Sequence, residues 1–141
     1  MRRFGENVKK SIKYKTRIGV YGIIFVGDEI LLTYQNNDEI QLPGGGVDTG
    51  EHKTHALARE VREETGWKID PVKYIGAYQR FVFMPEYDLW AHKICHICYC
   101  RGIYPLSKPI ERDHVPILTK PYIALSLLRN SGDKKFLRDC F

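Results

Sequence analysis

Apolar residues of the first third of the chain gather in short runs separated by turn residues. Residues 17–26 (RIGVYGIIFV) and 30–35 (ILLTYQ) are rich in β-branched and aromatic side chains, and the Gly-Asp-Glu between them is typical of a turn. We therefore predict a β-hairpin. A further turn is expected at residues 36–39 (NNDE), before a short apolar segment at 40–42. The following Pro-Gly-Gly-Gly, residues 43–46, is expected to break any regular element.

The pattern becomes helical between residues 51 and 65, where the chain has no proline or glycine. Asp48 or Thr49 can cap the start of this helix, and Gly66 is well placed to end it. The rest of the chain predicts strands at 72–83 and 89–103, a proline-rich loop at 104–116, and short helices at 122–130 and 133–141 separated by Ser131 and Gly132. The order of strands, helix, strands and helices predicts a single α/β domain, in which helices cover the faces of a mixed sheet.

Composition narrows the class of protein. The chain has 141 residues, which is enough for one domain with its own core. Hydrophobic residues make up 43% of the chain and charged residues 28%, as is typical of soluble globular proteins. No apolar run is long enough to cross a membrane, and the N-terminus has no apolar signal-peptide core. We therefore expect a cytoplasmic protein without a membrane partner.

Positive charge is concentrated at the N-terminus. The net charge is +5, yet residues 1–20 alone carry +6, because seven basic side chains stand against Glu6. The seven are Arg2, Arg3, Lys9, Lys10, Lys13, Lys15 and Arg17. We predict a basic arm at 1–16 and a single domain at 17–141. Such an arm can steer anionic ligands or contact nucleic acid, although a solvated terminus is the simpler and favoured interpretation.

Four cysteines, Cys95, Cys98, Cys100 and Cys140, suggest no disulfide framework. Three of them lie in an alternating segment together with His96, so a zinc site is one interpretation. No second ligand pair at zinc-finger spacing is present, and cysteine is often buried. We therefore favour reduced thiols on a buried strand, with Cys98 and Cys100 on one face and Cys95 on the other.

Three carboxylates crowd the end of the predicted helix. Glu60, Glu63 and Glu64 are three or four residues apart or adjacent, so they share one side of a helix and repel one another. Many exposed helices look like this, but a hard cation such as Mg²⁺ or Mn²⁺ would also compensate the charge. The glycines at 44–46 favour the second interpretation, since a glycine turn can bring backbone atoms close to a metal or a phosphate.

The same stretch resembles the signature of a known family. The Nudix box has the pattern G-x5-E-x7-R-E-U-x-E-E-x-G-U, where U is bulky and apolar. All nine defined positions are filled, by Gly45, Glu51, Arg59, Glu60, Val61, Glu63, Glu64, Gly66 and Trp67. The order of predicted elements is also similar to that of Nudix hydrolases. The resemblance implies a Nudix-type α/β/α sandwich, with a mixed β-sheet and the loop–helix–loop of the box on one face.

The resemblance also implies an activity and a set of site residues. Nudix hydrolases cleave the diphosphate of nucleoside diphosphates linked to another group X, with Mg²⁺ or Mn²⁺. By similarity, Glu60, Glu63 and Glu64 are metal ligands, and Glu60 or Glu64 can also act as the base. The Gly44 carbonyl is a further candidate ligand, and Gly45 and Gly46 are candidates for binding substrate. Arg59 is expected to orient the glutamates with Glu51 as its partner, a role compatible with a purely structural ion pair.

Relatives often use one more carboxylate from a loop after the later strands. Glu111 is the best-placed candidate here, with Asp113 behind it. A tryptophan that many relatives carry shortly afterwards is replaced by Val-Pro-Ile-Leu, which leaves the alignment open. His114 and His55 are candidate general bases, and we expect His55 to be exposed and without an orienting partner.

The identity of X lies outside the box. Residues typical of enzymes acting on NADH, coenzyme A, ADP-ribose or diadenosine polyphosphates are not found at the matching positions. By elimination, we expect a mutator-type enzyme that converts a nucleoside triphosphate, or its deoxy form, to the monophosphate and pyrophosphate. Other nucleotide diphosphate derivatives and triphosphorylated RNA 5′ ends remain alternatives. A non-catalytic nucleotide-binding regulator is disfavoured because the box keeps all its glutamates. We expect a monomer or a homodimer.

Overall fold

A single mixed sheet organises the chain. The computed structural model describes residues 1–35, 39–111 and 113–141. Within them the sheet has eight strands: β1 (Arg2–Arg3), β2 (Lys15–Val26), β3 (Glu29–Gln35), β4 (Glu39–Gln41), β5 (Gly44–Gly46), β6 (Trp67–Met84), β7 (Leu89–Pro105) and β8 (His114–Thr119). The strand order is β1-β6-β7-β2-β3-β4, while β5 pairs with β2 and β8 pairs with β3. The β1–β6 and β2–β7 pairs are parallel and the others are antiparallel.

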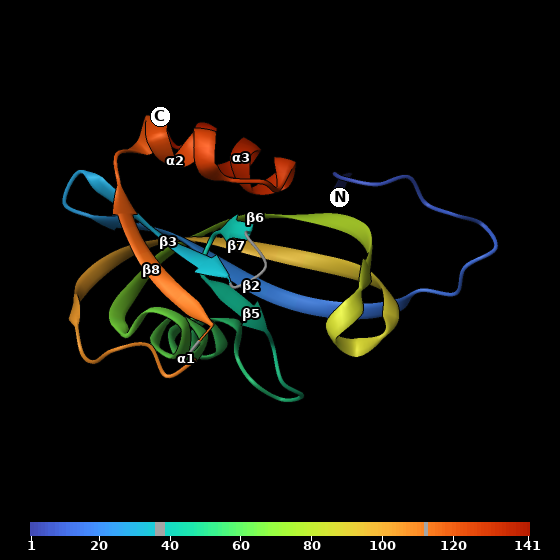
Figure 1. Ribbon diagram of the computed structural model, residues 1–141, viewed down its shortest axis with the longest axis horizontal. Coiled ribbons are helices and arrows are strands. Elements are labelled where there is room, and N and C mark those ends of the chain that lie inside the picture. The colour runs from blue at the N-terminus through green and yellow to red at the C-terminus, as the bar shows by residue number, and fades with distance from the viewer. Residues whose placement is uncertain (36–38, 112) are drawn as a thin grey trace.

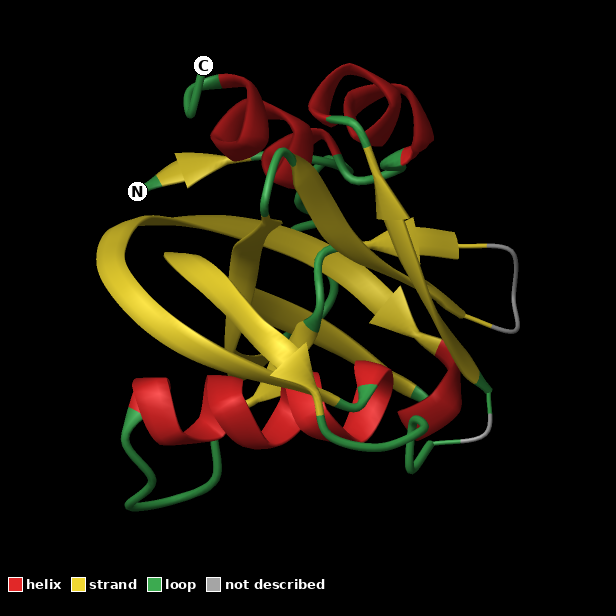
Figure 2. Cartoon of the chain, turned by 90° about the vertical axis from the view of Figure 1, so that its left-hand side faces the viewer, coloured by secondary structure: helices red, strands yellow, loops and turns green. Residues whose placement is uncertain are grey.

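Helices cover both faces of this sheet (Figure 1). They are α1 (Lys53–Thr65), α2 (Pro121–Leu127) and α3 (Ser131–Arg138), and a short 3₁₀ helix, η1 (Pro85–Tyr87), joins β6 to β7. The α1 helix lies on one side of the sheet, and α2 and α3 lie together on the other. The predicted α/β/α sandwich is therefore confirmed. Figure 2 shows how the long β6–β7 hairpin bends around the middle of the molecule.

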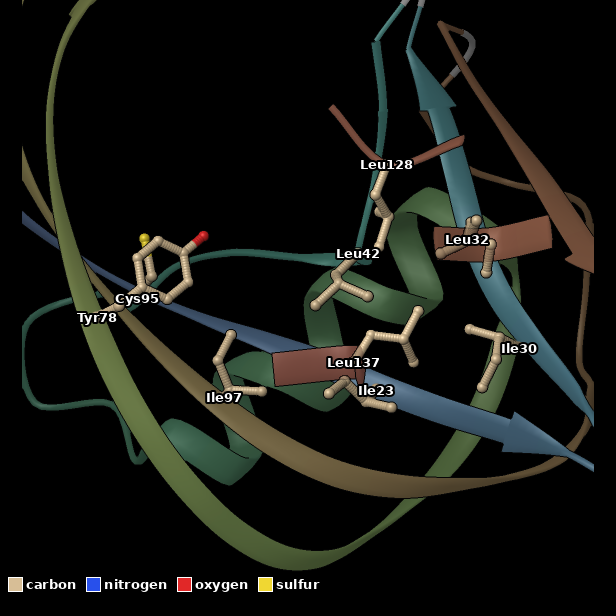
Figure 3. Close-up of a cluster of buried hydrophobic side chains, with 10 residues drawn as sticks. Ile23, Ile30, Leu32, Leu42, Tyr78, Cys95, Ile97, Leu128 and Leu137 are labelled. Atoms are coloured by element: carbon tan, nitrogen blue, oxygen red, sulfur yellow. The ribbon is translucent and has the colours of Figure 1, made fainter. Parts of the chain in front are cut away.

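Two apolar clusters fill the spaces between the layers. One lies between the sheet and the C-terminal helices and contains Ile23, Leu32 and Leu137 (Figure 3). The other lies between the sheet and α1 and contains Val20 and Val61. The alternation of β7 sends Cys95 into the first cluster and Cys98 and Cys100 into the second, and all three thiols are buried. The predicted buried strand and its two faces are confirmed.

The sequence analysis did not predict the β5 and β8 strands. The Gly44–Gly46 segment was expected to break regular structure, but it forms β5 against β2. Only glycine fits at position 44, because a Cβ atom there would collide with the Val20 carbonyl oxygen. The second missed strand is β8, which lies within a segment predicted to be a loop because of its prolines. Within the described part of the chain, β8 pairs only with β3 and forms an edge, so Pro116 is tolerated there.

The start of the α1 helix differs from the prediction, whereas its C-terminal end agrees with it. The helix begins at Lys53, and the N-cap residue is His52, whose side chain makes no capping hydrogen bond. The expected caps, Asp48 and Thr49, lie further upstream, because residues 47–52 are needed to connect β5 to the helix. Gly66 ends the helix in the left-handed conformation with a φ of 77°, as predicted.

Two other boundaries were wrong. The β6 strand begins at Trp67, before the predicted start at residue 72, because Pro71 is accommodated at an irregularity in the pairing with β7. Ser131 and Gly132 do not separate the C-terminal helices but start α3, which is capped by the side chain of Asn130. Gly132 packs so closely on the Tyr78 ring that a Cβ atom there would overlap it.

The N-terminal residues contact the sheet. Arg2 and Arg3 pair in parallel with β6, and the Phe4 ring packs edge-on against Tyr78. The division of the chain into an arm and a domain at residue 17 stays a prediction. The turn expected at 36–39 lies mostly outside the described residues. Among those residues, none of the helices is both long and apolar enough to span a membrane.

Candidate metal centre

The C-terminal half of α1 brings its glutamates against the glycine strand β5. A Cβ atom on Gly45 would lie 2.5 Å from the Glu60 Oε2 atom, so glycine is required for the Glu60 carboxylate to occupy its place. The backbone amide of Gly44 donates a hydrogen bond of 3.0 Å to Glu64 Oε1. The pairing of glycines on β5 with glutamates on α1 therefore has a physical reason. Small residues on the strand leave room for carboxylates on the helix, and an otherwise free amide orients one of them.

Arg59 connects the two ends of this loop–helix segment. Its Nε and Nη2 atoms donate to the two carboxylate oxygens of Glu51, each at 3.0 Å. Its Nη1 atom donates to Glu60 Oε1 at 3.0 Å and lies 3.5 Å from Glu63 Oε2, while Nη2 also donates to the Gly46 carbonyl. The Arg59 guanidinium thus holds the loop before α1 through Glu51 and Gly46, and it orients the carboxylates of Glu60 and Glu63.

The Glu51 carboxylate is held in its charged form by several donors. The hydrogen bonds from Arg59 come first, followed by one from the Asp48 amide, and together they lower the pKa of Glu51 to about 2. The same pairing raises the pKa of Arg59. His55 is exposed, as predicted, but its Nδ1 atom lies 3.1 Å from Glu51 Oε2, so the expectation that it has no partner was wrong.

The loop at residues 106–111, which is distant in sequence, is hydrogen-bonded to the C-terminal end of α1. The backbone amides of Ile110 and Glu111 both donate to the Glu63 carbonyl, at 2.9 and 3.0 Å, and the Leu106 amide donates to the Gly66 carbonyl at 2.7 Å. The last carbonyl groups of a helix lack partners within the helix, so these bonds satisfy them. They also place the Glu111 side chain beside the glutamates of the helix.

His114, the first residue of β8, lies behind Glu111 and is buried. Its Nε2 atom is 3.0 Å from Glu111 Oε2, and its Nδ1 atom is 3.0 Å from Thr33 Oγ1 and 3.7 Å from Glu64 Oε2. Gln35 contacts the same ring at Nε2. Burial lowers the pKa of His114 despite the nearby carboxylates. The imidazole is therefore fixed on both sides.

The carboxylates lie in an environment that disfavours their negative charge. Glu64 is only 4% exposed, and this burial raises its pKa to about 9, partly offset by the Gly44 amide. Burial is also the main cause that raises the pKa of Glu60 and of Glu111, and neighbouring carboxylates add to it. Without a cation the cluster is electrostatically unfavourable, as is common at functional sites.

The donor atoms fit a hard divalent cation. Ligand atoms of Glu60, Glu63 and Glu111 lie within 4.8 Å of one another, and so do those of Glu64, Glu111 and His114. Carboxylate oxygens are the ligands that Mg²⁺ and Mn²⁺ favour, and Mg²⁺ is usually held by a few carboxylates together with substrate phosphates. Glu111 belongs to both groups, so two ions could share it.

Most of the residues expected at the site are brought together. Glu51, Arg59, Glu60, Glu63, Glu64 and Glu111 form one connected network with the glycines at 44–46. Their roles as ligands or base stay predictions. Asp113 is exposed. Sequence reasoning did not find Thr33 and Gln35, because their link to the site depends on the pairing of β3 with the missed strand β8.

The glycine strand and the clustered glutamates thus form a candidate metal centre on an α/β/α sandwich. The family model for the NUDIX domain matches residues 15–137, and the chain belongs to this family of hydrolases. The solved MutT protein from Methanosarcina mazei Go1 has a similar fold, with a TM-score of 0.70 and 22% identity, over 91% of this chain and 94% of that one.

Two curated relatives from Bacillus subtilis match part of the chain. The protein named "Putative 8-oxo-dGTP diphosphatase YtkD" is 38% identical over 60 residues, which cover 43% of this chain and 38% of the relative. A second, named "Putative 8-oxo-dGTP diphosphatase", is 47% identical over 49 residues, which cover 35% of this chain and 33% of the relative. The matches thus span less than half of either relative.

Proposed function

We propose that the protein is a Mg²⁺- or Mn²⁺-dependent pyrophosphohydrolase that converts a nucleoside or deoxynucleoside triphosphate to the monophosphate and pyrophosphate. The proposal is supported mainly by one observation: the Glu111 carboxylate lies beside those of Glu60, Glu63 and Glu64. The fourth carboxylate comes from a different part of the chain and is held by backbone hydrogen bonds to Glu63. Four crowded carboxylates are costly unless they hold cations.

In this proposal the four carboxylates and the Gly44 carbonyl would hold the metal. Divalent cations at the site would neutralise the diphosphate and lower the pKa of a bound water. Glu60 or Glu64 accepts the proton from the attacking water, and the pKa of Glu64 depends strongly on whether a cation is present. Arg59 keeps Glu60 and Glu63 in position while Glu51 holds Arg59. Gly45 leaves room for the Glu60 carboxylate, and the backbone amide of Gly46 would be the group that contacts a substrate phosphate.

The names of the two Bacillus subtilis relatives support a purine nucleoside triphosphate as the substrate. Dinucleoside polyphosphates, nucleotide sugars, ADP-ribose and triphosphorylated RNA ends are the alternative substrates, since the metal centre contacts only the diphosphate. A regulator that binds nucleotides without cleaving them is the alternative from another class. The full set of box glutamates argues against it.

The test is a hydrolysis screen with Mg²⁺ and with Mn²⁺ over nucleoside triphosphates and the alternative substrates, with products identified by mass spectrometry. We expect monophosphate and pyrophosphate from at least one triphosphate. Glu63→Gln should lower kcat/KM by more than about 100-fold, because even residues that only orient ligands cost 10- to 100-fold. Glu29→Gln removes the same charge away from the site and is the control. Nucleotide binding without turnover of any compound would support the regulator instead.

A further inference from the structure

The charge of the basic arm, residues 1–16, is not neutralised by the rest of the protein. All six basic side chains of the arm are exposed: Arg2, Arg3, Lys9, Lys10, Lys13 and Lys15. Among residues 1–35, 39–111 and 113–141, no salt bridge joins any of them to a carboxylate. Unpaired cations at this density create a positive potential that attracts a polyanion.

Aromatic rings lie next to Lys9 of the arm and next to Arg17, which directly follows the arm. The Lys9 Nζ atom is 4.9 Å from the centroid of the Trp90 ring, and the Arg17 guanidinium is 4.5 Å from that of Tyr87. Trp90 in turn contacts Phe83 across the hairpin, with ring centroids 5.2 Å apart. Phe83 is 36% exposed and Tyr87 55% exposed, although both are large and apolar. The rings of Phe83, Tyr87 and Trp90, at the tip of the β6–β7 hairpin, thus belong to neither apolar core cluster.

We propose that the basic arm and the rings Phe83, Tyr87 and Trp90 form an arm–hairpin surface that binds single-stranded nucleic acid. Such surfaces combine cations that follow the phosphate backbone with aromatic rings on which bases stack. A duplex would offer the phosphates but no free base faces. An acidic peptide would offer the charge but no planar bases for the exposed rings.

The position of the surface agrees with this partner. The arm leads directly into β2, where Val20 pairs with Gly45 of the glycine strand. Arg17 precedes Val20 by three residues, a distance of about 10 Å along a strand. A bound strand can therefore extend toward the metal centre, where nucleotide phosphates are expected. This last step rests on the proposed function, whereas binding at the arm–hairpin surface does not.

The first test is fluorescence anisotropy with labelled 12-nucleotide single-stranded DNA and RNA at several salt concentrations. Lys10→Gln/Lys13→Gln should lower the slope of log affinity against log salt by about 1.4, since each phosphate contact contributes about 0.7. The charge-matched control is Lys73→Gln/Lys134→Gln, in which both lysines lie outside the arm. The control should keep the wild-type slope.

The second test concerns the rings. Tyr87→Ala should weaken binding on the order of tenfold, because stacking of one base contributes that much or more. Tyr122→Ala, at a position 72% exposed on α2, is the matched control and should bind like the wild type. Both rings lie outside the core, so the melting temperatures of the variants should match that of the wild type.

Two results would overturn the proposal. One is that no oligonucleotide binds at 50 mM salt. The other is that the arm variant and its control lose affinity equally. In the first case, binding to phosphatidylserine vesicles would assign the surface to a membrane instead. Hydrolysis of mononucleotide triphosphates is measured in parallel. Hydrolysis without oligonucleotide binding rejects only this inference, whereas binding without hydrolysis of any nucleotide rejects only the proposed function.

Discussion

Replacing Gly45 with alanine tests whether the glycine strand exists to make room for a metal ligand. The added Cβ atom would lie 2.5 Å from both the Cδ and the Oε2 atom of Glu60, whereas ordinary contacts begin at 3.4 Å. The carboxylate must therefore move by at least the difference, 0.9 Å. Metal–ligand distances tolerate changes of only about 0.2 Å, so Glu60 would lose the metal coordination proposed for it.

A misplacement of about 1 Å can cost 100-fold in rate. We therefore expect Gly45→Ala to lower kcat/KM by about 100-fold, which corresponds to about 2.7 kcal/mol of transition-state stabilisation. Glu60 also accepts a hydrogen bond from Arg59, and its displacement should disturb that contact. The concentration of Mg²⁺ needed for half-maximal activity should rise as well.

The matched control is Gly46→Ala, one residue further along β5. No heavy atom lies within 4 Å of a Cβ atom there, and neither glycine has a positive φ. This variant should retain activity within about threefold and bind Mg²⁺ normally, because ordinary surface changes have small effects. The assay is steady-state hydrolysis across a Mg²⁺ titration, with melting temperatures to show that both variants fold. Wild-type activity of Gly45→Ala, or an equal loss in Gly46→Ala, would refute the reasoning.

Two further substitutions and one measurement test the metal centre and the thiols. Glu64→Gln should remove most activity yet raise the melting temperature of the metal-free protein at neutral pH. Burial raises the pKa of Glu64 to about 9, so the carboxylate that is ionised in the unfolded chain must take up a proton on folding, a cost that the neutral amide does not have. A lower melting temperature would contradict this. Glu111→Gln should lower turnover and raise the Mg²⁺ requirement, and an unchanged metal titration would exclude it as a ligand. Elemental analysis after dialysis should find no stoichiometric zinc, whereas one zinc per chain would contradict structural thiols at Cys95, Cys98 and Cys100.

The hydrophobic pattern and the turn residues predicted those elements that are determined by interactions between residues close in sequence. The hairpin of β2 and β3, the α1 helix with its Gly66 end and the two faces of β7 follow from periodicity and from one left-handed glycine. The β5 and β8 strands could not be found in this way. A glycine segment has no side-chain pattern, and the proline of β8 is allowed only because the strand lies at an edge, which tertiary structure alone decides.

The same distinction separates the parts of the candidate site. The box fixes the residues that share one helix and its loop, because their spacing alone brings Glu60, Glu63 and Glu64 together. Glu111 comes from a loop that is attached to α1 through the backbone amides of residues 110 and 111, and such bonds leave no trace in the side-chain sequence. Its place could be guessed only from the resemblance to the family.

His114 shows the consequence of a single missed strand. As a residue of a predicted loop it was a candidate general base. As the first residue of β8 it is fixed by the pairing with β3, which supplies Thr33 and Gln35 to its two ring nitrogens. A ring so constrained can hold Glu111 in place but has little freedom to move toward a substrate. The register of an edge strand therefore changes the expected role of the histidine from acting on substrate to positioning a carboxylate.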